Sequence, residues 1–217
     1  MHTLTREMFM FGNLFNSYMS LDRVFNEKMT SEQIFESECK KLILASMEGI
    51  NVTIFTYGQT ASGKTFTMRG DPDQGGQPGL IPLSLKEIFH ELYTNHGQST
   101  KNLHGHGQHL YYRDPSSGNR KSYSPKDKKI RTWVIKVSYI EIYNECVNDL
   151  LDVTRKNLSV RENQQGRTII ENLSEYEVSS LEETMAYLQK GDEQRKIAET
   201  RLNEKSSRSH TVFKISI

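Results

Sequence analysis

The sequence predicts an α/β fold of three layers, with helices packed around a central sheet. Apolar residues recur at helical spacing from Ile34 to Met47 and again from Leu83 to Leu92. Apolar and polar residues alternate with the period of a strand from 133 to 139 and from 211 to 217. Helical and strand segments that follow one another in this way predict a sheet covered by helices.

The first helix has both a start signal and an end signal. Thr30 and Gln33 have the spacing of a capping box, in which each side chain bonds the other residue's backbone N–H. Gly49 follows the last apolar position and is typical of a helix end. We expect the apolar face of this helix to consist of Ile34, Phe35, Leu42, Ile43 and Met47.

The elements further along the chain have their own signals. The composition of Gly70–Gly79 predicts a loop ahead of the second helical stripe. Ser180 and Glu183 form a second capping box, and the helix that it opens is expected to break at Gly191. A separate helix is expected from Asp192 to about Leu202, before the final strand.

The composition indicates a globular chain with nearly balanced charge. Over 217 residues, Lys and Arg number 28 and Asp and Glu number 27, which gives a net charge of +1. This balance offers no bulk electrostatic case for binding nucleic acid or an anionic membrane. No apolar run approaches the ~20 residues that span a bilayer. Cys39 and Cys146 are far apart in the sequence and predict reduced thiols, so we expect a soluble cytoplasmic chain.

Residues 58–65 fit the pattern G-x-x-x-x-G-K-[ST], a loop that binds the phosphates of a nucleoside triphosphate. Asn51–Tyr57 is β-branched and aromatic, so we expect a buried strand there, with a helix after the loop. Glycines let successive N–H groups face the phosphates, the lysine reaches the β- and γ-phosphates, and the final hydroxyl binds Mg²⁺. The alternative is a glycine turn that only connects a strand to a helix. The predicted nucleotide-binding residues are Gly58, Gln59, Thr60, Ala61, Ser62, Gly63, Lys64 and Thr65, with Thr65 also a metal ligand.

A second polar motif, Asn203–His210, reads N-E-K-S-S-R-S-H and precedes the last strand. Taken alone, a serine-rich polar segment predicts only a loop. Beside a phosphate-binding loop it gains another interpretation, because a γ-phosphate sensor needs short hydroxyls that bind Mg²⁺ or orient water, and a nearby cation. Ser206, Ser207 and Arg208 supply those groups.

With these two motifs the sequence resembles the kinesin motor family, whose loop reads G-Q-T-x-S-G-K-T and whose first switch reads N-x-x-S-S-R-S-H. Further blocks agree, including Gly49–Gly58 and V-S-Y-I-E-I-Y-N-E at 137–145, and the resemblance extends from about Tyr18 to Ile217. The segments at 157–172 and 191–195 are most similar to the centromere-protein-E-like branch. The fold that this resemblance implies is a three-layer P-loop NTPase of the kinesin motor type, with a central mixed sheet.

The resemblance also implies ATP and Mg²⁺ as cofactors and assigns roles to single residues. Phe66 would lie against the adenine, and Ser207 would complete the Mg²⁺ shell. Asn203 and Ser206 would contact the γ-phosphate or the attacking water, and Arg208 would pair with a carboxylate of the second switch.

The function implied is that of an ATP-binding, microtubule-based motor, in which a microtubule-stimulated ATPase drives movement. The sequence contains no D-L-A-G-S-E second switch and no R-x-R-P adenine motif, so we expect a motor domain truncated at both ends. The strand at 51–57 would then lack its usual neighbours. The alternative function is a truncated remnant that binds nucleotide or tubulin without hydrolysis. A myosin-like motor or a small GTPase is a further alternative, but the chain has no N-K-x-D guanine motif.

Residues 1–17 are left unassigned, and residues 18–217 are assigned to a partial kinesin-like motor domain. From about 95 to 129 the chain is polar with no sustained period, which predicts an inserted mobile loop. Its basic end is a candidate contact for acidic tubulin, with a solvated loop as the alternative. The expected partner is the microtubule, in the cytoplasm and cytoskeleton. Neither nucleic acid nor a membrane is expected, and the oligomeric state stays open.

Overall fold

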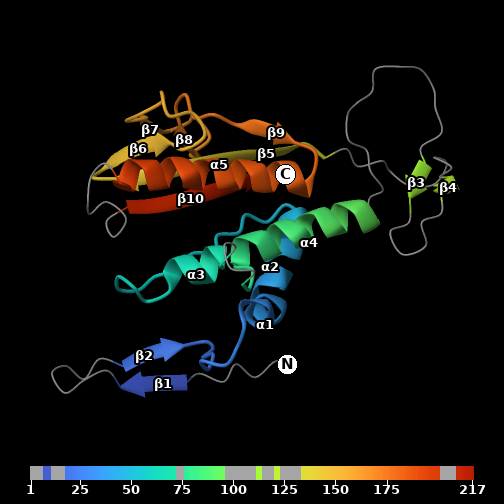
Figure 1. Ribbon diagram of the computed structural model, residues 1–217, viewed down its shortest axis with the longest axis vertical. Helices are drawn as coiled ribbons and strands as arrows, with labels where there is room; N and C mark the ends of the chain where they lie inside the picture. Colours follow the sequence, from blue (N-terminus) through green and yellow to red (C-terminus); the bar gives the residue numbers. More distant parts are fainter. Residues whose placement is uncertain are drawn as a thin grey trace.

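The computed structural model describes residues 7–10, 18–71, 76–95, 111–113, 120–122, 133–200 and 209–217. The elements in chain order are β1 (Glu7–Met10), β2 (Tyr18–Leu21), α1 (Ser31–Ile34), the π-helix η1 (Phe35–Cys39), α2 (Lys40–Met47), α3 (Lys64–Arg69), α4 (Leu80–Asn95), β3 (Tyr111–Arg113), β4 (Arg120–Ser122), β5 (Ile135–Tyr143), β6 (Cys146–Asp149), β7 (Val160–Glu162), β8 (Thr168–Ile170), β9 (Tyr176–Val178), α5 (Leu181–Thr200) and β10 (Ser209–Ser216). In Figure 1 the sheet and α5 occupy the upper part of the molecule, α4, α3 and α2 lie below them, and the β1–β2 pair lies apart at the bottom.

Strand β5 is the centre of the main sheet, whose order is β10-β5-β6, with β9 paired to the first residues of β5. Each of these ladders is antiparallel. The strand predicted at 133–139 continues to Tyr143, because the ladder with β10 extends as far as the pair Ser209↔Tyr143. Burial alternates along β10, as the sequence pattern predicts for a strand with one covered face.

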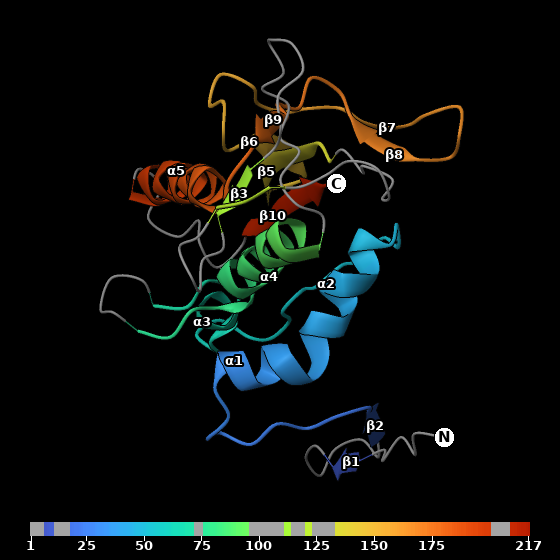
Figure 2. The same ribbon diagram turned by 90° about the vertical axis from the view of Figure 1, so that its right-hand side faces the viewer.

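One face of this sheet carries the hydrophobic core. Val137 and Tyr139 of β5 are 0% and 2% exposed. Tyr139 clusters with Leu85 of α4 and Leu188 of α5, and its ring lies edge-on to that of Phe213, with centroids 5.3 Å apart. Phe213 is opposite Tyr139 in the β10–β5 register, so both rings point to the same face. Helices α4 and α5 therefore pack side by side against one face of the sheet (Figure 2).

The predicted capping box at the start of α1 is confirmed. The Thr30 hydroxyl accepts from the backbone N–H of Gln33 at 3.3 Å, and the Gln33 side chain accepts from the N–H of Thr30 at 3.0 Å. Two of the helix's unpaired N–H donors are thereby satisfied. At the other end, α2 stops before Gly49, whose φ of +94° is accessible mainly to glycine.

The middle of this helix contains a π-helical turn that the sequence pattern did not predict. The wider turn moves the buried positions to a spacing of four, and these positions are Phe35, Cys39, Ile43 and Met47. The prediction that Leu42 lies on the apolar face is wrong, because its side chain is 39% exposed. In a regular α-helix the residue seven positions after Phe35, Leu42, would lie on the same face as Phe35. The wider π-turn shifts the following residues by one position, so Ile43 lies on that face instead.

The second predicted capping box is only half formed. The N–H of Glu183 donates to the Ser180 hydroxyl at 3.1 Å, as expected. The Glu183 carboxylate does not return to Ser180 and instead accepts from the N–H of Ser179 at 2.8 Å. Ser180 is thus the residue that caps the start of α5, and the Glu183 carboxylate bonds the preceding Ser179 instead of Ser180.

The predicted break at Gly191 is wrong, as is the separate helix from Asp192, because α5 runs without interruption from Leu181 to Thr200. The reason for a glycine here is space. A Cβ built on Gly191 would lie 2.2 Å from Cδ1 of Tyr139, so the helix approaches the tyrosine ring more closely than any other residue would allow.

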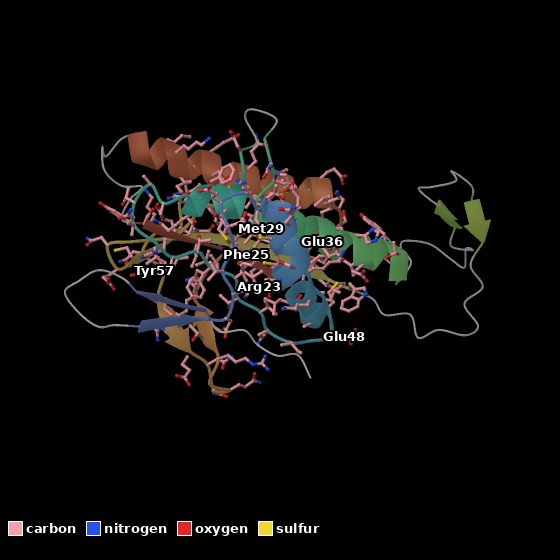
Figure 3. All side chains as sticks on the ribbon, turned by 90° about the horizontal axis from the view of Figure 1, so that it is seen from below. Arg23, Phe25, Met29, Glu36, Glu48 and Tyr57 are labelled. Atoms are coloured by element: carbon pink, nitrogen blue, oxygen red, sulfur yellow. The ribbon has the colours of Figure 1, made fainter. Side chains whose placement is uncertain are left out.

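The strand predicted at Asn51–Tyr57 does not form in the described residues. This segment is extended and belongs to no ladder, and Phe55 and Tyr57 are 77% and 94% exposed. Only one side of it is covered, where Ile54 packs against the cluster around Phe35. An extended segment becomes a strand only when neighbouring strands satisfy its N–H and C=O groups, and the described part of the chain provides none there. This segment therefore belongs to none of the sheets of the described residues, and in Figure 3 Tyr57 lies well away from the helix that carries Glu36.

Among the described residues, three two-stranded ladders lie outside the main sheet, namely β1–β2, β3–β4 and β7–β8. β3 and β4 fall within the polar segment for which the sequence predicts a loop, and they add a short antiparallel pair to it. Of its basic end, Arg120 and Lys121 belong to β4, whereas Lys126, Lys128, Lys129 and Arg131 lie outside the described residues.

The two cysteines are free, as predicted. Burial raises the pKa of the Cys39 thiol, and the carboxylate of Glu38 raises it further. Within the described ranges, no helix combines the length and the apolar character that crossing a membrane requires.

Asp149 organises the turn after β6 and should be important for stability. Its carboxylate is 2% exposed and accepts from the N–H groups of Leu151 at 2.8 Å, Asp152 at 3.1 Å and Ser174 at 2.9 Å, and from the Ser174 hydroxyl. Asp149→Asn replaces one accepting oxygen with a donor that faces other donors. We expect the free energy of unfolding to fall by about 2 kcal/mol.

Chemical denaturation of the variant checks this expectation. Asp152→Asn is the control, because Asp152 serves only the exposed turn beside it, and its effect should be much smaller. Equal midpoints for Asp149→Asn and the wild type would contradict the assigned role.

Candidate nucleotide-binding site

The loop at 58–65 connects the extended segment 51–57 to α3. Two of its residues have left-handed backbone angles, Ala61 with φ of +62° and Gly63 with φ of +87°. Gly63 is the N-cap of α3 and has no capping side chain. The first N–H groups of α3 are therefore left for another acceptor, and the orientation of the helix favours an anionic one.

Lys64 holds the loop together through its side chain. Its ammonium donates to the carbonyl of Gly58 at 2.8 Å and to that of Gln59 at 2.6 Å. Within the loop the N–H of Ser62 also donates to the Gln59 carbonyl, at 3.3 Å. The positive charge thus lies against the loop backbone, within a few ångströms of the residues that would face a phosphate.

Gly58 leaves room for the side chain of Ser62 within the loop. A Cβ at this position would lie 2.5 Å from Oγ of Ser62. At the other glycine, Gly63, the carbonyl accepts from both the N–H and the hydroxyl of Thr67, at 2.9 and 3.1 Å, which fixes the first turn of α3. The glycine positions of the motif therefore have local structural reasons in addition to any ligand.

The remaining predicted ligand residues lie at the surface. Thr60, Ala61, Ser62 and Thr65 are exposed, and the ring of Phe66 is 51% exposed. Their side chains have room for a ligand, and their roles in binding nucleotide or metal stay predictions.

The end of α3 and the start of α4 meet where the backbones at Gly70 and at Pro78–Gly79 lie in contact. The N–H of Gly70 donates to the carbonyl of Phe66 at 2.7 Å, and Gly70 forms a bridge with Pro78. A Cβ on Gly70 would lie 2.2 Å from the carbonyl oxygen of Gln77, and one on Gly79 would lie 2.5 Å from the nitrogen of Gly70. The two glycines allow two backbone segments to pass in direct contact.

Three residues that sequence reasoning did not connect meet at the end of α3. Arg69 forms an ion pair with Asp192 of α5 and donates to the Tyr139 hydroxyl of β5 at 3.4 Å. The Tyr139 hydroxyl in turn donates to Asp192 at 2.8 Å. Tyr139 is 70 positions from Arg69 and 53 positions from Asp192, so no local sequence pattern predicts the contact of the three residues. Opposite charges at the ends of two predicted helices were the only available signal.

The predicted catalytic residues Asn203, Ser206, Ser207 and Arg208 lie outside the described residues. The described elements on either side of them are α5 and β10. Arg195 of α5 donates to the Ser209 hydroxyl at the start of β10, at 3.5 Å. The helix that precedes the motif is thus in contact with Ser209, the first residue of the strand that follows.

The sequence model of the kinesin motor domain family matches residues 13–217. The chain belongs to the kinesin motor domain family. A kinesin-like protein of Arabidopsis thaliana, KIN-7M, chloroplastic, is 35% identical over 198 residues. The mouse kinesin-like protein KIF27 is 35% identical over 203 residues. Each alignment covers 91% of this chain, which spans 15% and 12% of the two relatives.

The kinesin fold is also found by structural comparison. A solved structure described as a fast kinesin has a TM-score of 0.69 and 28% sequence identity. The match covers 92% of this chain and 48% of the other. It confirms the predicted P-loop NTPase class of kinesin motor type. The preference for a centromere-protein-E-like branch stays a prediction.

Proposed function

We propose that this kinesin-family chain binds ATP with Mg²⁺ at residues 58–65 and serves a microtubule motor. The observation that carries the proposal is the position of Lys64, the first residue of α3. Its ammonium donates to the carbonyls of Gly58 and Gln59, and the N-cap of the helix, Gly63, has no capping side chain. A cation and free N–H groups on one short loop favour a polyphosphate.

The residues present fit both parts of the ligand. The phosphates would receive the loop N–H groups and the Lys64 ammonium, and the exposed Phe66 ring offers a flat surface for the adenine. The exposed hydroxyl of Thr65 is an oxygen donor of the kind that Mg²⁺ prefers. When bound, Mg²⁺ supplies charge neutralisation at the β- and γ-phosphates. Ser207 is the proposed second hydroxyl ligand.

For hydrolysis, the chain's own contribution is to position groups and stabilise charge. Asn203 and Ser206 are proposed to orient the attacking water at the γ-phosphate, and Arg208 to pair with a carboxylate that fixes the first switch. The contact of Arg195 with Ser209 supports this arrangement, because it ties the helix before these residues to the strand after them.

Microtubules are the proposed partner, and the microtubule cytoskeleton is the proposed location. Membership of the kinesin motor domain family supports this proposal. The solved fast kinesin is described with implications for its ATPase mechanism and its interactions with microtubules. Some relatives are described as chloroplastic or mitochondrial, and those locations concern those proteins.

The test is ATP affinity followed by steady-state ATP hydrolysis, with and without microtubules, in the purified protein. Binding together with stimulated turnover is the expected result. Tight binding without turnover would favour the second candidate, a nucleotide- or tubulin-binding protein that does not hydrolyse ATP. Failure to bind ATP would overturn the proposal.

A further inference from the structure

The contact among Arg69, Tyr139 and Asp192 joins three elements that have different tasks. Arg69 is the last residue of α3, the helix that begins at the phosphate loop. Asp192 lies in the middle of α5, the helix that leads toward residues 201–208, and Tyr139 lies on the central strand between them. Each of the three side chains touches the other two.

The network is largely buried, which distinguishes it from the surface ion pairs of this chain. The Arg69 and Asp192 side chains are 19% and 22% exposed, and Tyr139 is 2% exposed. Burial lowers the pKa of the Arg69 guanidinium and the nearby Arg195 lowers it further, while the Tyr139 oxygen opposes both. An arginine stays protonated in proteins, so removing the Asp192 carboxylate would leave a largely buried positive charge without its counter-charge.

The fit of α5 against Tyr139 leaves little freedom for this network. Gly191 precedes Asp192, and the lack of a side chain there lets the helix backbone rest on the tyrosine ring. The hydroxyl of the same tyrosine bonds the Asp192 carboxylate at 2.8 Å. A shift of α5 along the sheet would therefore break the bond to Tyr139 and the ion pair to α3 together.

We propose that Arg69, Tyr139 and Asp192 are positioning residues that couple the phosphate-loop helix α3 to α5. Nucleotide bound at 58–65 fixes α3, and the network passes that position to the helix that precedes Asn203–Arg208. The inference rests on the proposed function. It assigns to Arg69, at the end of α3 away from the phosphate loop, an indirect effect on nucleotide affinity through the position of the helix.

The test is a charge swap read out as affinity for a fluorescent ADP analogue with Mg²⁺. Arg69→Asp and Asp192→Arg should each weaken affinity by about tenfold, because each leaves like charges facing one another. The double variant restores opposite charges and should return the affinity to within about threefold of the wild type. The unfolding midpoint of each variant is measured in parallel, so that loss of folded protein is not counted as loss of affinity.

The exposed pair Arg161–Glu171 provides the matched control. Its atoms lie 3.0 Å apart, and the side chains are 64% and 40% exposed at the β7–β8 hairpin, far from the loop in sequence. Arg161→Glu and Glu171→Arg, alone or together, should leave nucleotide affinity unchanged.

Single network variants that are less stable but bind nucleotide as the wild type does would overturn the inference and leave a purely structural ion pair. Failure of the folded double variant to recover affinity would overturn it as well. If the swapped protein does not fold, Tyr139→Phe decides, because it removes only the hydroxyl: affinity weakened by about threefold supports the inference, and unchanged affinity overturns it. If the wild type binds no nucleotide, the proposed function is overturned and this inference with it. If the wild type binds nucleotide and the network variants bind it equally well, this inference alone is overturned.

Discussion

Lys64→Arg is expected to lower the affinity for ATP by about 100-fold or more, although the charge is conserved. The Lys64 ammonium fits between two carbonyls of its own loop, at 2.8 and 2.6 Å. A guanidinium is planar and forked, so it cannot make both contacts and reach a phosphate from the same backbone position. Isothermal titration with ATP and Mg²⁺ measures the effect.

Lys41→Arg is the matched control for this substitution. Lys41 forms an exposed pair with Glu38, at 2.8 Å, where either basic residue can serve. ATP affinity and stability should both remain at the wild-type level. If Lys64→Arg bound ATP as tightly as Lys41→Arg, Lys64 would not be a phosphate ligand.

Gly70→Ala is expected to lower the free energy of unfolding by about 3 kcal/mol or more, combining backbone strain with overpacking. Gly70 has φ of +79°, and a Cβ there would lie 2.2 Å from the carbonyl oxygen of Gln77 and 2.6 Å from the nitrogen of Gly79. Both atoms belong to the backbone, so neither can rotate away. Because this contact joins the end of α3 to the start of α4, nucleotide affinity should fall along with stability.

Gly166→Ala separates the two sources of the loss. Gly166 has a similar φ of +72°, but its added Cβ would meet only the flexible end of Glu162, at 3.4 Å. It should cost about 1 kcal/mol, the strain of a left-handed alanine alone. Denaturant midpoints of the two variants measure the difference. Equal losses would show that the contact at Gly70 can relax and that it does not hold α3 rigidly.

The sequence determined the elements whose signals are local. The capping box of Thr30 and Gln33, the apolar stripe of α4 and the alternation of β10 each depend on neighbours a few residues away, and each is found in the structure. The glycine and lysine positions of the 58–65 loop are of the same kind, because the chemistry of a phosphate loop is written in consecutive residues. The family and its fold followed from these motifs and were confirmed by comparison.

The tertiary structure decided what depends on residues far apart in the chain. Of Leu42 and Ile43, both predicted on the apolar face, the π-turn keeps only Ile43 buried. Contact with Tyr139 explained Gly191, which sequence reasoning had taken for a helix break. The segment 51–57 has the composition of a strand, yet strand formation needs hydrogen-bonding neighbours, and the described residues supply none. The meeting of Arg69, Tyr139 and Asp192 is the clearest case. Their contact depends on how two helices pack against one sheet, and no spacing within the sequence encodes that distance.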